Sequence, residues 1–207
     1  MHNPNSRLEA FCDGVFAIAI TLLIIEIKIP PIENIHTKIE LWDALAHSWP
    51  SWLAFFISFI TILISWVNHS HALKSFGKTS PQFTYANGLL LMAIIILPFP
   101  TMAIAEYLQT DIAQPAITLY CAASLLNNIA WNIIQYTYTH PQSLFKPSVN
   151  IEKIRAGIMT TRMGFGLYLF AFLLSFWFPL TAFIIVASSW GIWLILSISI
   201  KEENITA

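Results

Sequence analysis

The chain has 207 residues, of which 57% are hydrophobic and only 10% are charged, and its formal net charge at pH 7 is −1. A soluble domain carries about 25% charged residues, so this composition excludes a soluble globular protein and indicates a polytopic membrane protein. The sequence also contains no long basic run, which argues against nucleic acid as a partner.

Six apolar stretches are long enough to cross the ~30 Å hydrocarbon core of a bilayer as helices. They cover residues 8–29, 48–67, 83–105, 113–136, 160–178 and 179–200. The last two are separated because Pro179 lacks the backbone N–H that a continuous helix needs. The connections are too short for a separate soluble domain. The sequence therefore predicts an all-α fold in which residues 1–207 form a single six-helix membrane domain.

Lysine and arginine predict the orientation of these spans. With six spans, both termini lie on the same side of the membrane. The terminal segments and the second and fourth connections, including the residues just beyond them, carry eight of these residues, whereas the other connections carry only Lys28 and Lys38. Because cytoplasmic connections are enriched in lysine and arginine, both termini are predicted to be cytoplasmic.

The first span is unusual because it carries Asp13 near one end and Glu26 near the other. The twelve uncharged residues between them cover ~18 Å as a helix, less than the ~30 Å hydrocarbon core. At least one acid must therefore lie at the edge of the hydrocarbon or inside it, where acids pair or face water. The predicted topology places these candidate partners of Asp13 at a similar depth: Arg7, Trp66, Asn68, His69 and Asn87.

Successive helical residues turn by about 100°, which places Ile18, Leu22 and Ile25 on one narrow apolar stripe of the first span. Thr21 lies beside this stripe, and Glu26 lies about 80° from Ile18. The side opposite the stripe, which includes Asp13, is expected to pack against the rest of the subunit. Periodicity alone indicates only a surface that faces lipid or another helix.

Three segments resemble the transmembrane protein 175 family, which comprises lysosomal potassium channels of animals and their bacterial and archaeal homologues. Residues 7–21 resemble its RxxxFSD opening, with Arg7, Phe11 and Asp13 in place but Cys12 where the family usually has serine. Residues 66–69 resemble its W-x-N-H segment and residues 97–101 its LPFxT segment. A thiol is a weaker hydrogen-bond donor than a hydroxyl, so the contacts around Asp13 are expected to be looser here.

The resemblance implies a cation channel without the usual selectivity-filter loop, assembled as a homotetramer in the cell membrane of a prokaryote. The first helix of each subunit would line the central pore, with hydrophobic constrictions at Ile18, Leu22 and Ile25. The resemblance also implies a supporting network for that helix, made of Arg7, Phe11, Asp13, Trp66, Asn68, His69 and Asn87. Potassium is the expected permeant ion, with sodium and protons left open, and no cofactor or resident metal is expected.

The contribution of Glu26 stays open between two interpretations. Four copies would form an acidic ring at the outer mouth that concentrates cations, with Thr21 contributing a hydroxyl near the pore. Alternatively, Glu26 is an interfacial acid that pairs with Lys28 or Lys38.

A secondary transporter of a cation or small solute is the alternative function. Its substrate site would lie at mid-membrane, and the best candidates are Asn127, Asn128 and Asn132. These asparagines are equally interpretable as hydrogen-bond partners between helices. An enzyme is not predicted, because the sequence shows no HExxH motif, no Ser/His/Asp set and no paired carboxylates expected within a cleft.

Overall fold

The computed structural model describes residues 6–28, 31–75, 78, 80–139 and 151–203, and these residues contain helices but no strands. The elements are α1 (Ser6–Leu22), η1 (Leu23–Glu26), η2 (Ile32–Asn34), α2 (Lys38–His47), α3 (Trp49–Ser75), α4 (Pro81–Ile96), α5 (Pro98–Tyr107), α6 (Ala113–Thr139), α7 (Ile151–Leu174) and α8 (Pro179–Glu203). The predicted all-α class with six membrane spans is confirmed. The segments long and apolar enough to cross a membrane are Ser6–Ile25, Trp49–Ser75, Pro81–Tyr107, Ala113–Thr137, Arg155–Leu174 and Pro179–Leu196.

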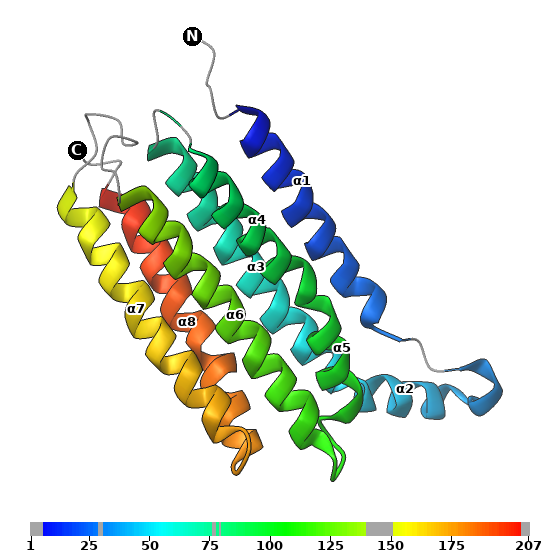
Figure 1. Ribbon diagram of the computed structural model, residues 1–207. Coiled ribbons are helices and arrows are strands. Elements are labelled where there is room, and N and C mark those ends of the chain that lie inside the picture. The colour runs from blue at the N-terminus through cyan, green and yellow to red at the C-terminus, as the bar shows by residue number, and fades with distance from the viewer. Residues whose placement is uncertain (1–5, 29–30, 76–77, 79, 140–150, 204–207) are drawn as a thin grey trace.

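The spans form one bundle with α1 at one edge and α7 at the opposite edge (Figure 1). The first residues of α1 and the last residues of α8 lie at the same end of the bundle, as six spans require. At the other end, α2 lies across the bundle direction and projects away beyond α1. The assignment of the α1 end to the cytoplasm stays a prediction.

The first span differs from the predicted helix over 8–29. The α-helix ends at Leu22, continues as the 3₁₀ helix η1, and gives way to extended backbone at Ile27 (φ −81°, ψ 102°). The consecutive prolines Pro30 and Pro31 prevent a longer helix, because neither has an N–H to donate. A 3₁₀ helix rises ~2.0 Å per residue instead of ~1.5 Å, so η1 lengthens the span without adding residues.

Three further spans differ from the sequence prediction. The fifth is α7, which begins at Ile151 and ends at Leu174 instead of covering residues 160–178. The third span is divided at Leu97, because Pro98 and Pro100 cannot donate backbone hydrogen bonds to the preceding turn. The second span continues beyond residue 67 to Ser75, so the histidines at its end are helical.

Helix α2 was not predicted. Thr37 and Glu40 form a capping box at its start, in which the Thr37 hydroxyl accepts from the Glu40 amide and the Glu40 carboxylate accepts from the Thr37 amide. The backbone N–H of His36 also donates to this carboxylate and lowers the pKa of Glu40 below its usual value. The spacing Thr-x-x-Glu was the available sequence signal for this helix start.

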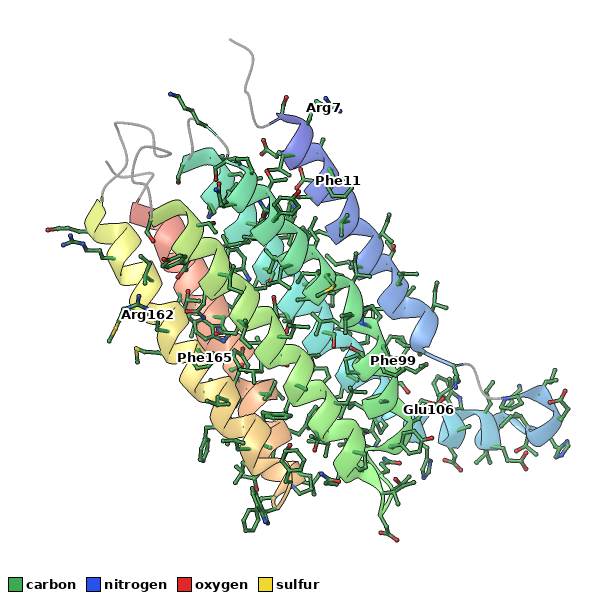
Figure 2. All side chains as sticks on the ribbon, viewed as in Figure 1. Arg7, Phe11, Phe99, Glu106, Arg162 and Phe165 are labelled. Carbon is green, nitrogen blue, oxygen red and sulfur yellow. The ribbon has the colours of Figure 1, made fainter. Side chains whose placement is uncertain are left out.

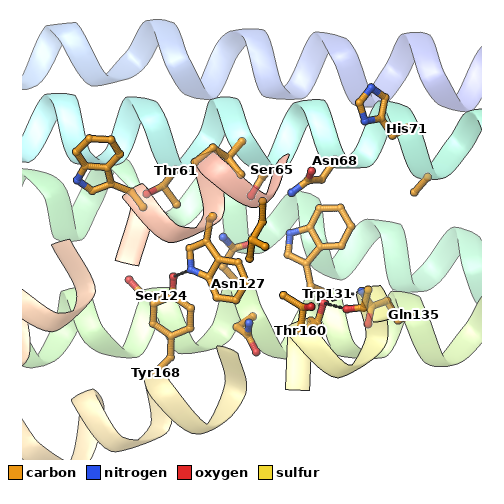
Figure 3. Close-up of a pocket in the computed structure, with 18 of the residues that line it drawn as sticks. Thr61, Ser65, Asn68, His71, Ser124, Asn127, Trp131, Gln135, Thr160 and Tyr168 are labelled. Carbon is orange, nitrogen blue, oxygen red and sulfur yellow. Dashed lines mark hydrogen bonds between the residues drawn. The ribbon is translucent and has the colours of Figure 1, made fainter. Parts of the chain in front are cut away.

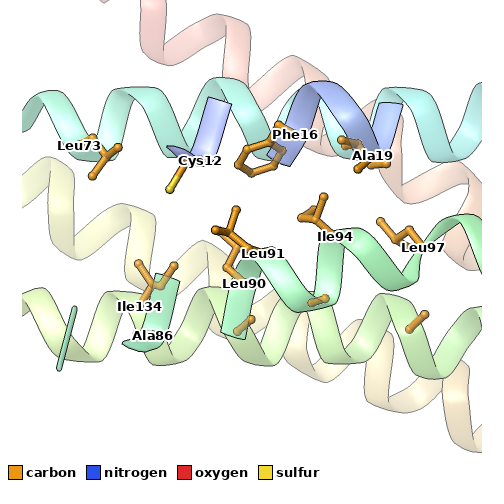
Figure 4. Packing of buried hydrophobic residues seen from close by; sticks show 14 of the residues in the cluster. Cys12, Phe16, Ala19, Leu73, Ala86, Leu90, Leu91, Ile94, Leu97 and Ile134 are labelled. Atoms are coloured by element: carbon orange, nitrogen blue, oxygen red, sulfur yellow. The ribbon is translucent and has the colours of Figure 1, made fainter. Parts of the chain in front are cut away.

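Two apolar clusters form the interior, and α3 and α6 contribute to both. The first joins α1 to α3, α4 and α6, and Figure 4 shows Phe16 and Ala19 of α1 facing Leu91 and Ile94 of α4. The second joins α7 and α8 to α3, α5 and α6. Helix α1 therefore packs against the bundle through one side only, which includes Cys12, Phe16 and Ala19.

Candidate pore-lining helix and its supporting contacts

The side of α1 that faces away from the bundle carries the predicted apolar stripe. The exposed fractions are 61% for Ile18, 39% for Leu22 and 69% for Ile25. Thr21 is also exposed, and its hydroxyl donates to the Ile18 carbonyl at 2.9 Å. Because the described residues of the protomer leave these side chains exposed, the stripe is available to lipid, to a neighbouring subunit or to a pore.

Asp13 contacts α3 from the opposite side of α1. The indole Nε1 of Trp66 donates to Oδ1 of Asp13 at 2.8 Å. This hydrogen bond to a carboxylate fixes the first half of α1 against α3. The partner that the position of Asp13 requires near the membrane edge is therefore an indole N–H.

His69 and Asn87 make a second polar contact one turn further along α3. Nε2 of His69 and Oδ1 of Asn87 are 2.8 Å apart, and both side chains are almost completely buried. The ring of Phe16 lies against His69, with centroids 5.5 Å apart and an interplanar angle of 47°. This contact connects α1, α3 and α4, so Phe16 holds α1 against a polar pair that itself joins two helices.

Asn68 lies on a different side of α3 from its neighbours. Trp66 and His69 are about 60° apart around the helix axis, whereas Asn68 is about 100° from His69 and about 160° from Trp66. Asn68 lines a cavity between α3, α6, α7 and α8 and does not share the α1-facing surface. A similar depth in the membrane therefore does not put Asn68 in one network with Trp66 and His69. The angle around the α3 axis separates them and could be read from the sequence.

Arg7 and Phe11 are also apart from the contacts around Asp13. Both side chains are exposed, Phe11 to 63%, and both lie near the start of α1 (Figure 2). Their helical angles fall within about 20° of Ile18, so they extend the exposed stripe toward the N-terminal end. Within one protomer, the structure does not bring them to Trp66, His69 or Asn87.

The other end of the first span carries an exposed ion pair that was not predicted from the sequence. Nζ of Lys28 contacts Oε1 of Glu106, near the end of α5. The topology gave a signal for this pair, because the first connection and the end of the third span lie on the same side of the membrane. The side chain of Glu26 lies outside the described part of the structure, and its predicted site remains a proposal.

The asparagines of α6 have separate environments. Nδ2 of Asn132 donates to the carbonyl of Asn128 at 2.9 Å and to that of Thr161 in α7 at 3.4 Å. Gln135 donates to the Thr161 hydroxyl at 2.7 Å. These contacts connect α6 with α7. Asn127 and Asn128 both line the same cavity as Asn68, and Figure 3 shows Asn127 and Asn68 there.

Comparison with known proteins identifies the family. The family model described as endosomal/lysosomal potassium channel TMEM175 matches residues 7–98. A potassium channel of Chamaesiphon minutus is 41% identical over 174 residues, which are 84% of this chain and 85% of that protein. A potassium channel of Streptomyces collinus is 38% identical over 166 residues, or 80% and 77% of the two chains.

A solved structure agrees with these relatives. The crystal structure of a lysosomal potassium-selective channel TMEM175 homologue from Chamaesiphon minutus superposes with a TM-score of 0.85 at 36% identity, covering 95% of this chain and 99% of that one. These relatives and the family are channels, a class distinct from enzymes. From the α1 motif, the shared fold and these identities, the chain belongs to the TMEM175 family of membrane channels.

Proposed function

We propose that this chain is the subunit of a potassium-conducting channel, a homotetramer whose central pore is lined by α1. The observation that carries the proposal is an uncovered apolar stripe on a helix whose opposite side is fixed to the bundle. The relatives are named potassium channels, which supports potassium as the permeant ion. Their bacterial origin supports the plasma membrane of a prokaryote as the location.

Four copies of α1 around one axis would place Ile18, Leu22 and Ile25 in successive hydrophobic rings. From Ile18 to Ile25 the rings extend over ~10 Å along the helix. A narrow hydrophobic constriction excludes water and stops ions, and a small widening lets it wet and conduct. The rings thus act as a gate. Cations enter from the cytoplasmic end and leave past Glu26, whose four copies attract cations at the outer mouth.

The contacts on the other side of α1 set the width of these rings. The Trp66–Asp13 hydrogen bond and the Phe16–His69 packing fix α1 to α3, and the Lys28–Glu106 ion pair fixes the outer connection to α5. A helix anchored at both ends keeps its apolar side chains at a constant distance from the axis. Loss of an anchor therefore changes the conductance without changing any residue of the pore.

The test is potassium flux into liposomes that contain the purified protein, measured for Ile18→Ala and Leu22→Ala. Smaller side chains widen the rings, so we expect the flux to rise several-fold. Ile184→Ala in α8 is the matched control, because Ile184 is exposed to a similar extent (65%) outside the α1 stripe. Unchanged flux in both ring variants contradicts the pore assignment.

The same liposomes separate the channel from the alternative transporter. A channel gives flux that does not require a second ion gradient, whereas flux that saturates and couples to a proton or sodium gradient supports a transporter. Replacing potassium by sodium or protons in this assay determines the selectivity. The mass of the complex in detergent tests the tetramer, and a stable monomer without cation flux overturns the proposed function.

A further inference from the structure

Helix α7 carries two arginines on its outward surface, at the end of the bundle where α1 begins. Arg155 and Arg162 are both exposed, and their positions around the helix differ by about 20°. They are ~10 Å apart along the helix axis. Figure 2 shows Arg162 on α7, at the edge of the bundle opposite α1. Both belong to the apolar span Arg155–Leu174, where a charged side chain is costly and calls for a partner.

The neighbouring helix α6 indicates the depth of Arg162 in the membrane. The preceding residue, Thr161, accepts a hydrogen bond from Gln135 of α6 at 2.7 Å. Tyr136, the next residue of α6, is 67% exposed, and the apolar span of that helix ends directly after it. Tyrosine is enriched where the hydrocarbon meets the headgroups, so Arg162 lies near this boundary and Arg155 lies beyond it. The long arginine side chain extends from this depth toward the headgroups.

Neither guanidinium group has a hydrogen bond or an ion pair with another described residue. Glu152 is the one acidic residue of α7, and it lies ~15 Å along the helix from Arg162, on the side away from the hydrocarbon. The ion pair of Lys28 and Glu106 lies at the other end of the bundle. The two arginines therefore present their charge to the surroundings of the bundle.

The surface below the arginines is apolar. Met159, Phe170 and Leu173 lie within about 80° of Arg162 around the helix and are 61%, 56% and 50% exposed. Gly166, one turn beyond Arg162, is also exposed, and a Cβ added there meets no atom within 4 Å. Because it has no side chain, it leaves a shallow depression among its larger neighbours. A hydrocarbon chain fits this part of the surface.

The position of α7 in the assembly determines what covers this surface. In the proposed tetramer α1 faces the central axis, so the opposite edge of each subunit, which is formed by α7, faces the lipid. This step rests on the proposed function. The partner of the two arginines is then a lipid and not a second protein surface.

The chemistry of two guanidinium groups selects an anionic phospholipid. Guanidinium groups bind phosphate oxygens through paired hydrogen bonds, and anionic headgroups collect around basic residues at the membrane surface. A zwitterionic headgroup brings its own cation beside the phosphate. An anionic headgroup brings net negative charge, which complements two cations that have no acidic partner.

We propose that Arg155 and Arg162 bind the phosphate of an anionic phospholipid, in the leaflet at the end of the bundle where α1 begins. Arg162 donates to the phosphate from the hydrocarbon side and Arg155 from the side of the aqueous phase. One acyl chain lies along Gly166 toward Leu173. By the predicted orientation this is the cytoplasmic leaflet, and the site lies at the periphery, away from the ion path.

The test is native mass spectrometry of the purified protein with added phosphatidylglycerol or phosphatidylcholine of the same acyl chains. We expect phosphatidylglycerol to be retained several-fold more than phosphatidylcholine, and Arg162→Gln or Arg155→Gln to reduce its retention several-fold. Lys78→Gln is the matched control, because it removes one exposed positive charge at the same end of the bundle but outside α7. Equal retention of the two lipids, or equal retention by Arg162→Gln and Lys78→Gln, overturns the proposal.

A second variant tests the acyl-chain part of the site without changing any charge. Gly166→Leu fills the depression and should also reduce the retention of phosphatidylglycerol. Gly191→Leu in α8 is its control, since a Cβ there is equally unobstructed. If Gly166→Leu and Gly191→Leu retain the lipid equally, the acyl chain does not lie along this surface and the proposed binding mode is rejected.

The same spectra distinguish this proposal from the proposed function. Loss of subunits from the complex of Arg162→Gln would show that the arginine binds a neighbouring subunit, which overturns the lipid site. Retained phosphatidylglycerol together with absent potassium flux rejects the channel alone. Normal flux without selective lipid retention rejects the lipid site alone.

Discussion

Helix α3 has two polar surfaces that face different regions of the bundle. Trp66 and His69 face α1 and α4, where Trp66 donates to Asp13 and where Phe16 and Asn87 cover His69. Asn68 and Ser65 face the cavity instead. Neighbouring residues of one short motif thus support two regions, one tightly packed and one open. This arrangement shows that a motif read as a unit in sequence need not act as a unit in a helix.

The largest expected effect is on the packed surface. Phe16→Ala removes a ring that is 1% exposed and lies against His69, so we expect a loss of about 3 kcal/mol in the free energy of unfolding. Thermal or denaturant unfolding in detergent measures it. Phe11→Ala is the matched control on the same helix, because Phe11 is 63% exposed and its truncation opens no cavity. Equal losses for the two variants would mean that the two sides of α1 are not distinct.

The next effect is expected where α7 packs closely against α6 and α8. A Cβ at Gly164 would lie 2.6 Å from Nδ2 of Asn128 and 2.9 Å from the ring of Trp193. Gly164→Ala should therefore force α7 away and cost about 2 kcal/mol of unfolding free energy. Gly166→Ala, where the added Cβ meets nothing within 4 Å, should be neutral or slightly stabilising. Unfolding in detergent compares the two, and a stable Gly164→Ala variant would show that this packing is loose.

The sequence predicted the architecture well because a bilayer allows few alternatives. Spanning segments must satisfy their backbone internally, so an apolar stretch of sufficient length is a helix. The predicted helix ends differ from the observed ones where individual residues determine them. These places are Pro98, the prolines after α1 and the capping box of Thr37. Hydropathy does not record any of these features.

The candidate site was only partly predictable. The depth of Asp13 and its need for a partner followed from the sequence, and the structure supplies Trp66. Depth alone grouped Asn68 with the residues that contact α1, whereas the rotation of about 100° per residue places it on another side of α3. The pair of Lys28 and Glu106 and the cavity depend on how helices far apart in the chain are placed, which one sequence does not give.

A smaller effect is expected when the contact to Asp13 is removed. Trp66→Phe keeps an aromatic ring but deletes the N–H that donates to Asp13, and we expect a cost of about 1 kcal/mol because the pair is partly exposed. Potassium flux should also differ from that of the unmodified protein, since α1 loses a contact that positions it. Trp52→Phe, on the same helix and similarly exposed, is the control. If both variants conduct alike, Trp66 does not position the pore helix.

The smallest effect on α1 is expected from Asn68→Leu, which tests the separation of the two surfaces directly. Leucine has the same number of side-chain heavy atoms and the same branching as asparagine, so the substitution changes polarity at the cavity wall without opening a void. Since Asn68 lies about 160° around α3 from Trp66, potassium flux should stay within twofold of the unmodified protein. Potassium flux into liposomes, compared with that of Trp66→Phe, measures this effect. A loss of flux as large as that of Trp66→Phe would show that the motif acts as one network across α3, and the division between a packed surface and an open one would then have no functional meaning.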